Sequence, residues 1–340
     1  MTELDGSATP AIALIGGGTG SFTLLQELKE LTPNLSAIVN MSDDGGSTGI
    51  LRDELGVLPP GDVRQCLVAL SNSPEMRGAF SYRFGGDSLF AGHTIGNVIL
   101  AGFELYHGSF DQALKAASSI LNITGQVIPV TLESHVLHMQ DGDEQIKGEY
   151  AIAHRAINNR DASVSLEPAA AINPDASQAI AEADLVVIAP GNLFGSLLPA
   201  LAVDGMREAF TETPAKKVVV SNLVTKPGQT DGWHVVDYIK TIEQYVGEGQ
   251  IDAALYNQDL PSPELLRKYA AEEEFPVKTE LDRFKEVAAL PLGANLVASN
   301  PFEQDQNDKA IRRTLIRHDA YQVGRQLMSI FEQRFYESRD

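Results

Sequence analysis

A short apolar run followed by a glycine cluster dominates the start of the sequence. Residues 11–15 are continuously apolar, 16–20 read Gly-Gly-Gly-Thr-Gly, and 22–31 carry apolar residues at helical spacing. This order predicts a strand, a tight turn and a helix. A second apolar run at 35–39 follows closely, and two strands joined through a helix are typically parallel. The N-terminal segment therefore predicts a Rossmann-like βαβ unit.

Further apolar runs indicate that the same sheet resumes in the second half of the chain. They lie at 184–188, 217–220 and 251–256, next to segments of helical period such as 233–246. Residues 126–170 do not continue this pattern of buried strands and helices. Short runs in which apolar and polar residues alternate flank a turn at 141–143, which predicts a small β-rich, antiparallel insertion. We expect one α/β domain over 1–340, with a three-layer parallel sheet and a long helix at 308–335.

The charge balance excludes some classes of partner. The 340 residues include 26 Lys and Arg against 46 Asp and Glu, a formal net charge of −20. This charge repels phosphate backbones and anionic lipids, so we expect neither nucleic-acid nor membrane-surface binding. No apolar run approaches the roughly 20 residues of a membrane span, and residues 1–10 lack a signal-peptide pattern. The single cysteine excludes a disulfide framework. We expect a cytoplasmic protein that must hold any anionic ligand locally.

The first glycine cluster is a candidate phosphate site. Glycines let the backbone approach a ligand, and the N–H groups at the start of the next helix attract an anion. The candidate residues are Gly17, Gly18, Thr19 and Gly20. The pattern departs from the dinucleotide fingerprint, since Ser21 stands at the third glycine position and no Walker lysine follows. A tight turn without a ligand stays an alternative.

The loop after the second run combines acids, glycines and hydroxyls. Asp43 and Asp44 are adjacent carboxylates that can hold a hard cation such as Mg²⁺, and Gly45, Gly46 and Ser47 can form an anion nest. Together they predict a metal-bridged phosphate. The alternative is a turn whose carboxylates only accept hydrogen bonds from nearby backbone groups.

Two helix starts add further candidates. Asp62 is either an N-cap or a third oxygen ligand for a metal, and Arg64 either binds phosphate or pairs with a nearby acid. His93, in a glycine-bearing loop that ends at Asn97, can transfer a proton near neutral pH or serve as a structural hydrogen-bonding group. Asp62 and His93 are the candidate catalytic residues.

Two more polar loops follow later strands, and ligands of such sheets bind at the carboxyl ends of the strands. The candidates there are Gly191 and Asn192, then Asn222, Thr225 and Lys226. Five loops on one rim predict a cleft for a large phosphorylated ligand. Basic residues near the C-terminus either supply positive charge for such a ligand or only complement the helix dipole and form ion pairs; they are Lys309, Arg312, Arg313, Arg317, Arg325 and Arg334.

Taken in order, these motifs resemble the YvcK/CofD family over nearly the whole chain. The pairing of Asp-Asp-Gly-Gly with Pro-Pro-Gly-Asp is specific to it. The segments that carry the resemblance are 15–20, 42–49, 51–56, 58–64, 92–97, 189–192 and 225–228. The sequences of residues 58–67 and 317–319 are similar to those of the YvcK-like branch, the gluconeogenesis factors. The other branch is the 2-phospho-L-lactate transferases.

The resemblance implies a function and further site residues. It implies a Rossmann-like core, often dimeric, that binds UDP-sugars, notably UDP-N-acetylglucosamine, in a protein linked to carbon metabolism, cell shape and envelope synthesis. Tyr269 and Arg317 look like the two residues that contact the nucleotide sugar in this branch. The transferase branch would place a divalent metal at Asp43 or Asp44 and at Asp62.

This sequence departs from the family pattern at three positions. Asn192, Phe194 and Lys226 stand where Ser, Tyr and Gln are frequent. Our first hypothesis is a cytosolic regulator, expected to be a homodimer, that binds a nucleotide sugar. The alternative is a magnesium-dependent transferase of a phosphorylated group. An NAD-dependent dehydrogenase has less support because the dinucleotide fingerprint is broken.

Overall fold

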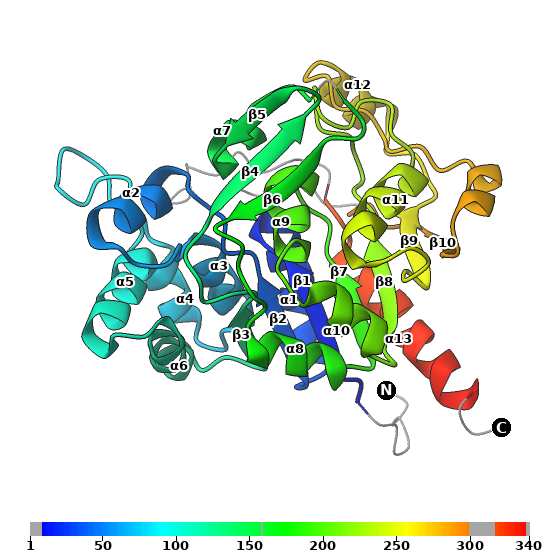
Figure 1. Cartoon of the computed structure of the whole chain (residues 1–340). Coiled ribbons are helices and arrows are strands. Elements are labelled where there is room, and N and C mark those ends of the chain that lie inside the picture. Colours follow the sequence, from blue (N-terminus) through cyan, green and yellow to red (C-terminus); the bar gives the residue numbers. More distant parts are fainter. Residues whose placement is uncertain (1–8, 158, 299–316, 338–340) are drawn as a thin grey trace.

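The central element is a parallel sheet of seven strands. The computed structural model describes residues 9–157, 159–298 and 317–337. The strand order is β10-β9-β8-β7-β1-β2-β3, and every neighbouring pair is parallel (Figure 1). The strands are β1 (Ile12–Gly16), β2 (Leu35–Val39), β3 (Gln126–Pro129), β7 (Leu185–Ile188), β8 (Lys216–Val220), β9 (Ala253–Asn257) and β10 (Leu290–Ala294). The predicted α/β class is confirmed.

Helices cover both faces of this sheet (Figure 1). One face carries α1 (Gly18–Leu31), α3 (Gly61–Leu70) and α13 (Ala320–Glu337), and the other carries α8 (Pro174–Ala181), α9 (Leu198–Leu201), α10 (Met206–Glu212) and α11 (Val235–Val246). Further helices are α2 (Gly46–Leu55), α4 (Pro74–Ser81), α5 (Ile95–His107), α6 (Phe110–Leu121) and α12 (Pro263–Ala270), with a π turn η1 (Leu193–Leu197) and a 3₁₀ turn η2 (Leu281–Glu286).

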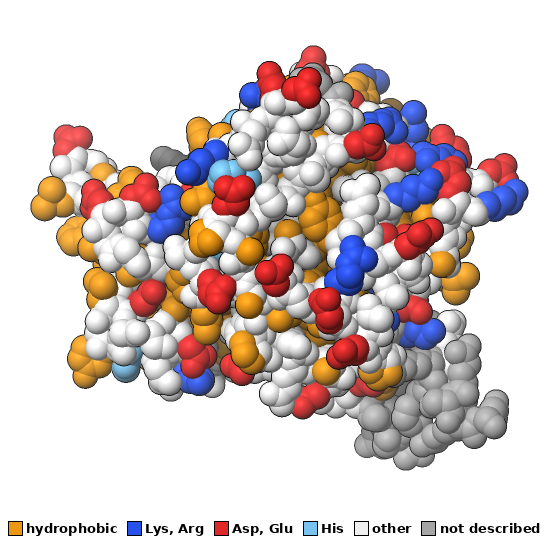
Figure 2. Space-filling model, viewed as in Figure 1, with side chains coloured by type: hydrophobic (Ala, Val, Ile, Leu, Met, Phe, Trp, Pro, Cys, Tyr) orange, Lys and Arg blue, Asp and Glu red, His pale blue; other side chains and the backbone are white. Residues whose placement is uncertain are grey.

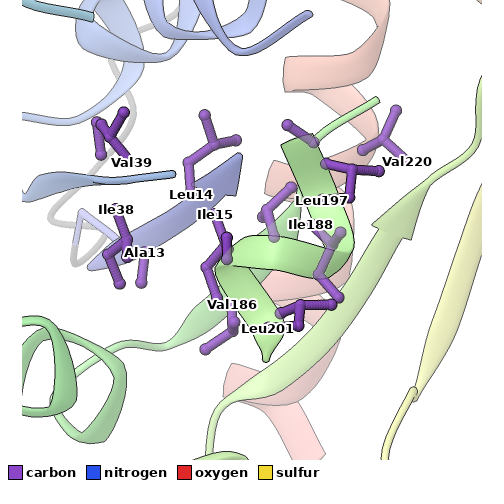
Figure 3. Packing of buried hydrophobic residues seen from close by; sticks show 14 of the residues in the cluster. Ala13, Leu14, Ile15, Ile38, Val39, Val186, Ile188, Leu197, Leu201 and Val220 are labelled. Carbon is purple, nitrogen blue, oxygen red and sulfur yellow. The ribbon is translucent and has the colours of Figure 1, made fainter. Parts of the chain in front are cut away.

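The core explains why the strand sequences are continuously apolar. Leu14 and Ile15 of β1 are fully buried and lie among side chains of β2, β7 and the turn that follows β7 (Figure 3). Strands covered on both faces need no polar face, so their residues do not alternate. Acidic side chains are scattered instead over the outer surface, as the net charge of −20 leads us to expect (Figure 2).

The path of the chain leaves a crevice in the middle of the sheet. From β1 the chain proceeds to β2 and β3 on one side, then returns to β7 and continues to β8, β9 and β10 on the other. The connections after β1 and β7 therefore run in opposite directions, and in open α/β sheets ligands bind at such a switch point, beyond the carboxyl ends of the strands.

A small antiparallel sheet lies over this carboxyl end. It consists of β4 (Val136–Asp141), β5 (Glu144–Lys147) and β6 (Ser163–Glu167), in the order β5-β4-β6, and α7 (Glu149–Ala153) follows β5 (Figure 1). The predicted insertion at 126–170 is wrong at its start, because 126–129 form β3, a parallel strand of the main sheet. A short apolar run alone does not reveal which sheet it joins.

The C-terminal helix begins later than expected. In the structure α13 starts at Ala320, where the Asp319 carboxylate accepts a hydrogen bond from the Gln322 N–H at 3.1 Å. Residues 317–319, expected inside a helix over 308–335, precede it. Lys309, Arg312 and Arg313 lie outside the described residues, as does the side chain of Arg334, so the predicted basic face is not tested. None of the described helices is long and apolar enough to cross a lipid bilayer.

Candidate functional site

A cavity of about 320 Å³ lies at the switch point, within the usual size of small-molecule sites. It is bounded by the turn after β1, the loops after β7 and β8, and the segment just before α13. Eight predicted ligand residues line it: Gly17, Gly18, Thr19, Gly20, Gly191, Asn192, Asn222 and Arg317. The structure therefore brings together residues that lie as much as 300 positions apart in the chain.

The glycine turn, residues 16–20, is shaped both by its own backbone and by the loop after β7. Gly18 has φ +64°, in the left-handed region that favours glycine, and it begins α1. A Cβ at Gly20 would lie 1.9 Å from the carbonyl oxygen of Pro190, so glycine is required for the loops after β1 and β7 to meet. The N-cap residue, Gly17, has no side chain to cap α1, and the first turn of the helix holds no acid, although the carboxylate of Asp62, from α3, accepts the Gly18 N–H. Turn geometry and anion binding are therefore compatible here.

The loops after β7 and β8 are held together by Asn222. Its Oδ1 accepts a hydrogen bond from the Gly191 N–H at 3.1 Å, and its Nδ2 donates to the Gly191 carbonyl at 2.8 Å. Asn192 fixes the next turn, since its Oδ1 accepts from the Gly195 N–H at 3.3 Å. Both asparagines line the cavity while using their oxygens to shape its wall.

Arg317 reaches the cavity because the next residue is anchored. The ring Nε2 of His318 hydrogen-bonds the Ser221 carbonyl at 3.0 Å, and Val297 pairs with His318 in an antiparallel bridge. Burial lowers the pKa of His318 to about 4, so its ring is neutral at physiological pH. A neutral anchor thus holds a permanent cation beside the glycine turn.

A group of carboxylates lies on the other side of the same turn. Asp62 is half-buried and accepts a hydrogen bond from the Gly18 N–H, and a Cβ at Gly17 would lie 2.2 Å from its Oδ2. Burial and the neighbouring Asp43 raise the pKa of Asp62 to about 7. Burial and then Asp43 and Asp62 raise the pKa of Glu149 to about 8. The three acids therefore share one poorly solvated region.

Asp43 and Asp44 serve different purposes. Asp43 accepts a hydrogen bond from the Gly45 N–H at 3.0 Å, and burial raises its pKa. The two oxygens of Asp44 accept from the N–H groups of Glu149 at 3.0 Å and Tyr150 at 2.7 Å, so this carboxylate caps α7. The hydrogen bonds of Asp44 therefore fit the alternative in which its carboxylate only accepts from nearby backbone groups.

The donor set accommodates a magnesium ion only in part. Within the described ranges, no three His, Cys, Asp or Glu side chains are placed to hold a metal ion together. Mg²⁺ is often bound by one or two carboxylates together with substrate phosphates. Asp43 and Asp62 fit that mode, because Asp62 lies at the glycine turn where a phosphate would be held and Asp43 is near enough to raise the pKa of Asp62.

Other predicted residues form a network behind the second loop and do not line the cavity. The Ser47 Oγ lies 2.9 Å from the His93 Nδ1 and accepts from the Asn97 Nδ2 at 3.1 Å. The Arg64 Nε donates in turn to the Asn97 Oδ1 at 2.9 Å. Gly45, at the N-cap of α2, and Gly46 precede this network. The catalytic assignment of His93 stays a prediction.

The last three predicted residues also lie outside the cavity lining. Thr225 exchanges two hydrogen bonds with the backbone of Phe275, and Lys226 donates to the Ala153 carbonyl at 2.5 Å. Tyr269 is buried in α12. Its predicted role in binding the nucleotide sugar stays a prediction.

Sequence reasoning missed Glu149. It follows Gly148 in the inserted sheet, and no motif marks it. Its side chain reaches the site only because α7 packs against η1, the turn after β7. A Cβ at Gly195, in that turn, would lie 2.6 Å from the Glu149 Oε1 and 2.8 Å from the Asn192 Nδ2. Only this fold-back of the insertion brings the carboxylate close to Asn192, which lines the cavity.

Known proteins share this arrangement over most of the chain. Gluconeogenesis factor of Bacillus subtilis is 36% identical over 328 residues, which cover 95% of this chain and 99% of that protein. Gluconeogenesis factor of Listeria monocytogenes is 40% identical over 262 residues, or 76% of this chain and 80% of that protein. A crystal structure of a UPF0052 family member from Bacillus halodurans superposes with a TM-score of 0.86 at 33% identity, covering 95% of this chain and all of that one.

The family model described as 2-phospho-L-lactate transferase CofD matches residues 12–297, a range that begins with β1 and includes the strands and loops of the crevice. Since that match spans most of the chain, the chain belongs to the CofD family, with gluconeogenesis factors of the YvcK-like type among its relatives.

Proposed function

We propose that this protein binds a nucleotide sugar of the UDP-N-acetylglucosamine type and acts as a cytosolic regulator of carbon metabolism, cell shape and envelope synthesis. The observation that carries the proposal is the cavity at the switch point, which is lined both by the first residues of α1 and by Arg317. Backbone N–H groups at a helix start and a guanidinium are the groups that bind a diphosphate.

Positive charge within the cavity makes it suitable for an anionic ligand although the protein as a whole is strongly acidic. The net charge of −20 disfavours an anion at long range, and its field is screened beyond about 8 Å in physiological salt. Inside the cavity, the partial positive charge at the start of α1 and the full charge of Arg317 act at contact distance. The protein therefore selects a compact anion that fits between them over an extended polyanion.

The functional names of the relatives support the regulatory part of the proposal. The matched proteins from B. subtilis and L. monocytogenes are both called gluconeogenesis factor. We extend that role to this chain, together with a homodimeric state, as part of the proposal.

Thermal unfolding tests the ligand class directly. UDP-N-acetylglucosamine or UDP at 100 times its Kd adds about 2.7 kcal/mol to the free energy of unfolding. NAD, which has a diphosphate but a different base and second half, serves as the comparison ligand. A rise in Tm with the uridine ligands supports the proposal. A rise with NAD alone, or none with either uridine ligand, contradicts it.

A second function is favoured by the acids beside the glycine turn and by the description of the family model. In this alternative the protein is a magnesium-dependent transferase of a phosphorylated group, with Asp43 and Asp62 holding the ion. A bound Mg²⁺ would stabilise the charge that develops on the transferred phosphate. The cavity residues would orient the donor, and Asp62 would be needed for turnover. Magnesium-dependent turnover that is lost in Asp62→Ala supports this alternative, and no turnover with a panel of nucleotide-linked donors removes it.

A further inference from the structure

We propose that a second copy of this chain packs on the outer face of α5, so that two copies pair about a two-fold axis passing near Gly102. We refer to six residues of this helix as the α5 face; they are Ile95, Val98, Ile99, Gly102, Leu105 and Tyr106. The inference rests on the homodimeric state included in the proposed function. It deepens that proposal by naming the surface through which the two copies meet.

Helix α5 is apolar on the side that faces away from the core. Its buried residues are Gly96, Asn97, Leu100 and Ala101. The α5 face lies on the opposite side, at the spacings of three and four residues that align side chains along a helix. Leu105 is 57% exposed and Tyr106 is 83% exposed. A helix at the surface of a soluble protein normally presents polar side chains to water, so this face is typical of one that a partner covers.

Further exposed apolar side chains surround the α5 face. The loop before α5 is joined to it by a hydrogen bond from the Ile95 N–H to the Tyr82 carbonyl at 2.9 Å, and α2 packs beside α5. The exposed residues of these two segments are Ile50 and Leu55 on α2, and Tyr82, Leu89 and Phe90 in the loop. Figure 2 shows hydrophobic side chains along the left of the view, where α2, α5 and this loop lie in Figure 1.

The exposed apolar area is large enough for a stable dimer. The seven large side chains of α2, the loop and the end of α5 are between 43% and 98% exposed. At about 200 Å² for each fully exposed side chain, they present roughly 800 Å². The largest patch on a typical monomer is about 300–600 Å², whereas each partner in a standard interface buries about 800 Å². The area therefore matches an interface better than an ordinary monomer surface.

Gly102, in the middle of the α5 face, favours a second copy as the partner. A Cβ added to Gly102 meets no atom within 4 Å, so the helix has a hollow there, with large side chains one turn away on either side. A two-fold axis through this hollow makes the two α5 helices antiparallel. Val98 then faces the partner's Tyr106, and each copy fills the space beside the glycine of the other. The same surface thus serves both copies.

Charge restricts where two such acidic copies can meet. The net charge of −20 makes them repel each other, but none of the six residues of the α5 face is charged, so contact there desolvates no charge of the face itself. A second exposed apolar edge, at β10, is less suitable. The Leu290 N–H bonds to the Asp252 carbonyl of the sheet, so the next residue along the strand, Pro291, stands where an outward N–H would be needed to add another strand.

Analytical ultracentrifugation of the full chain at about 1 to 100 μM tests the surface. We expect a dimer in the wild type, and a dimer Kd at least about 100-fold higher in Leu105→Glu, because the two-fold axis brings the new carboxylates together. Tyr106→Glu should have the same effect. Leu290→Glu is the matched control, since Leu290 is 65% exposed but lies at the other end of the sheet, and its dimer Kd should stay within about twofold. Circular dichroism checks that each variant is folded.

Cysteine cross-linking tests the symmetry. Helix axes about 8–10 Å apart place facing Cα atoms about 4–5 Å apart, within the range of a disulfide. Gly102→Cys should therefore give a covalent dimer on mild oxidation with copper phenanthroline. Gly78→Cys, at a helical glycine of α4 whose Cβ also meets no atom, should cross-link at least about 10-fold more slowly. The native Cys66 is buried and does not compete.

Four results overturn the inference: a monomeric wild type, a dimer that persists in both α5 variants, loss of the dimer in Leu290→Glu, and equal cross-linking of the two cysteine variants. The Tm of the wild type with UDP-N-acetylglucosamine separates these failures from that of the ligand proposal. A rise in Tm alongside any of the four results leaves the nucleotide-sugar site standing while the α5 pairing fails. A dimer that forms through the α5 face without any rise in Tm leaves the pairing standing while the ligand proposal fails.

Discussion

Replacement of Gly20 by alanine tests whether the loops after β1 and β7 meet as closely as the structure places them. Gly20 does not need a positive φ, so alanine introduces no backbone strain. The new Cβ would lie 1.9 Å from the Pro190 carbonyl oxygen and 2.9 Å from its carbon, and both are backbone atoms. Ordinary contact at about 3.5 Å requires the loops to separate by about 1.5 Å.

The expected cost follows from this displacement. Overpacking of a well-packed site destabilises a protein by about 1–3 kcal/mol, and we expect about 3 kcal/mol because backbone cannot swing aside as a side chain can. With an unfolding entropy near 2.1 cal/mol/K per residue, the 340 residues give about 0.7 kcal/mol/K, so Tm falls by about 4 °C. Scanning calorimetry and urea unfolding measure both quantities.

A matched glycine in a helix serves as the control. Gly78 lies in α4 with no atom within 4 Å of its added Cβ, so Gly78→Ala should stabilise the protein by about 0.5–1 kcal/mol. If Gly20→Ala unfolds within about 0.5 kcal/mol of the wild type, the two loops are not in contact, and the account of the crevice is wrong.

Three further predictions concern charged groups at the site. The pKa of Asp62 is about 7 in the folded protein, above its ordinary 3.8, so between these two values the folded protein binds more protons than the unfolded chain. The free energy of unfolding therefore falls as the pH rises from about 4 to 7. Asp62→Asn should remove this loss and raise the free energy of unfolding at pH 8 by a few kcal/mol, as urea titrations across pH will show. Asp44→Ala leaves two N–H groups of α7 without their acceptor, so amide hydrogen exchange at Glu149 and Tyr150 should accelerate about 10-fold or more. Unchanged protection of these amides would mean that Asp44 does not cap α7. Arg317→Ala should weaken UDP about 10- to 100-fold in calorimetry, and Arg325→Ala, on α13, should not; equal effects would argue against a direct contact.

The sheet was largely predictable from sequence because its strands are buried on both faces. The run at 35–39 coincides with β2, and the turn at 16–20 joins β1 to α1 as expected. β10 was missed, since it is an edge strand with a proline, a glycine and several exposed residues, and it lacks the apolar signature of a buried strand. β3 was assigned to the wrong sheet because its partner, β2, lies 90 residues earlier in the chain.

The site was predictable where it depends on local turns, and not where it depends on long-range packing. Gly17–Gly20 and Asn192 are visible as loop residues that follow strands, and the sheet brings them together. His93 and Asn97 are equally conspicuous in the sequence, yet they support Ser47 and do not line the cavity. Glu149 has no local signature, because its place depends on how the insertion folds back onto η1.

A crystal structure of the complex with UDP-N-acetylglucosamine tests the central claim most directly. The account predicts that oxygens of the diphosphate lie about 3 Å from backbone nitrogens of the turn at Thr19 and Gly20, with Arg317 on the nucleoside side of the phosphates. A diphosphate bound away from the carboxyl ends of β1 and β7, with the cavity left empty, would contradict it.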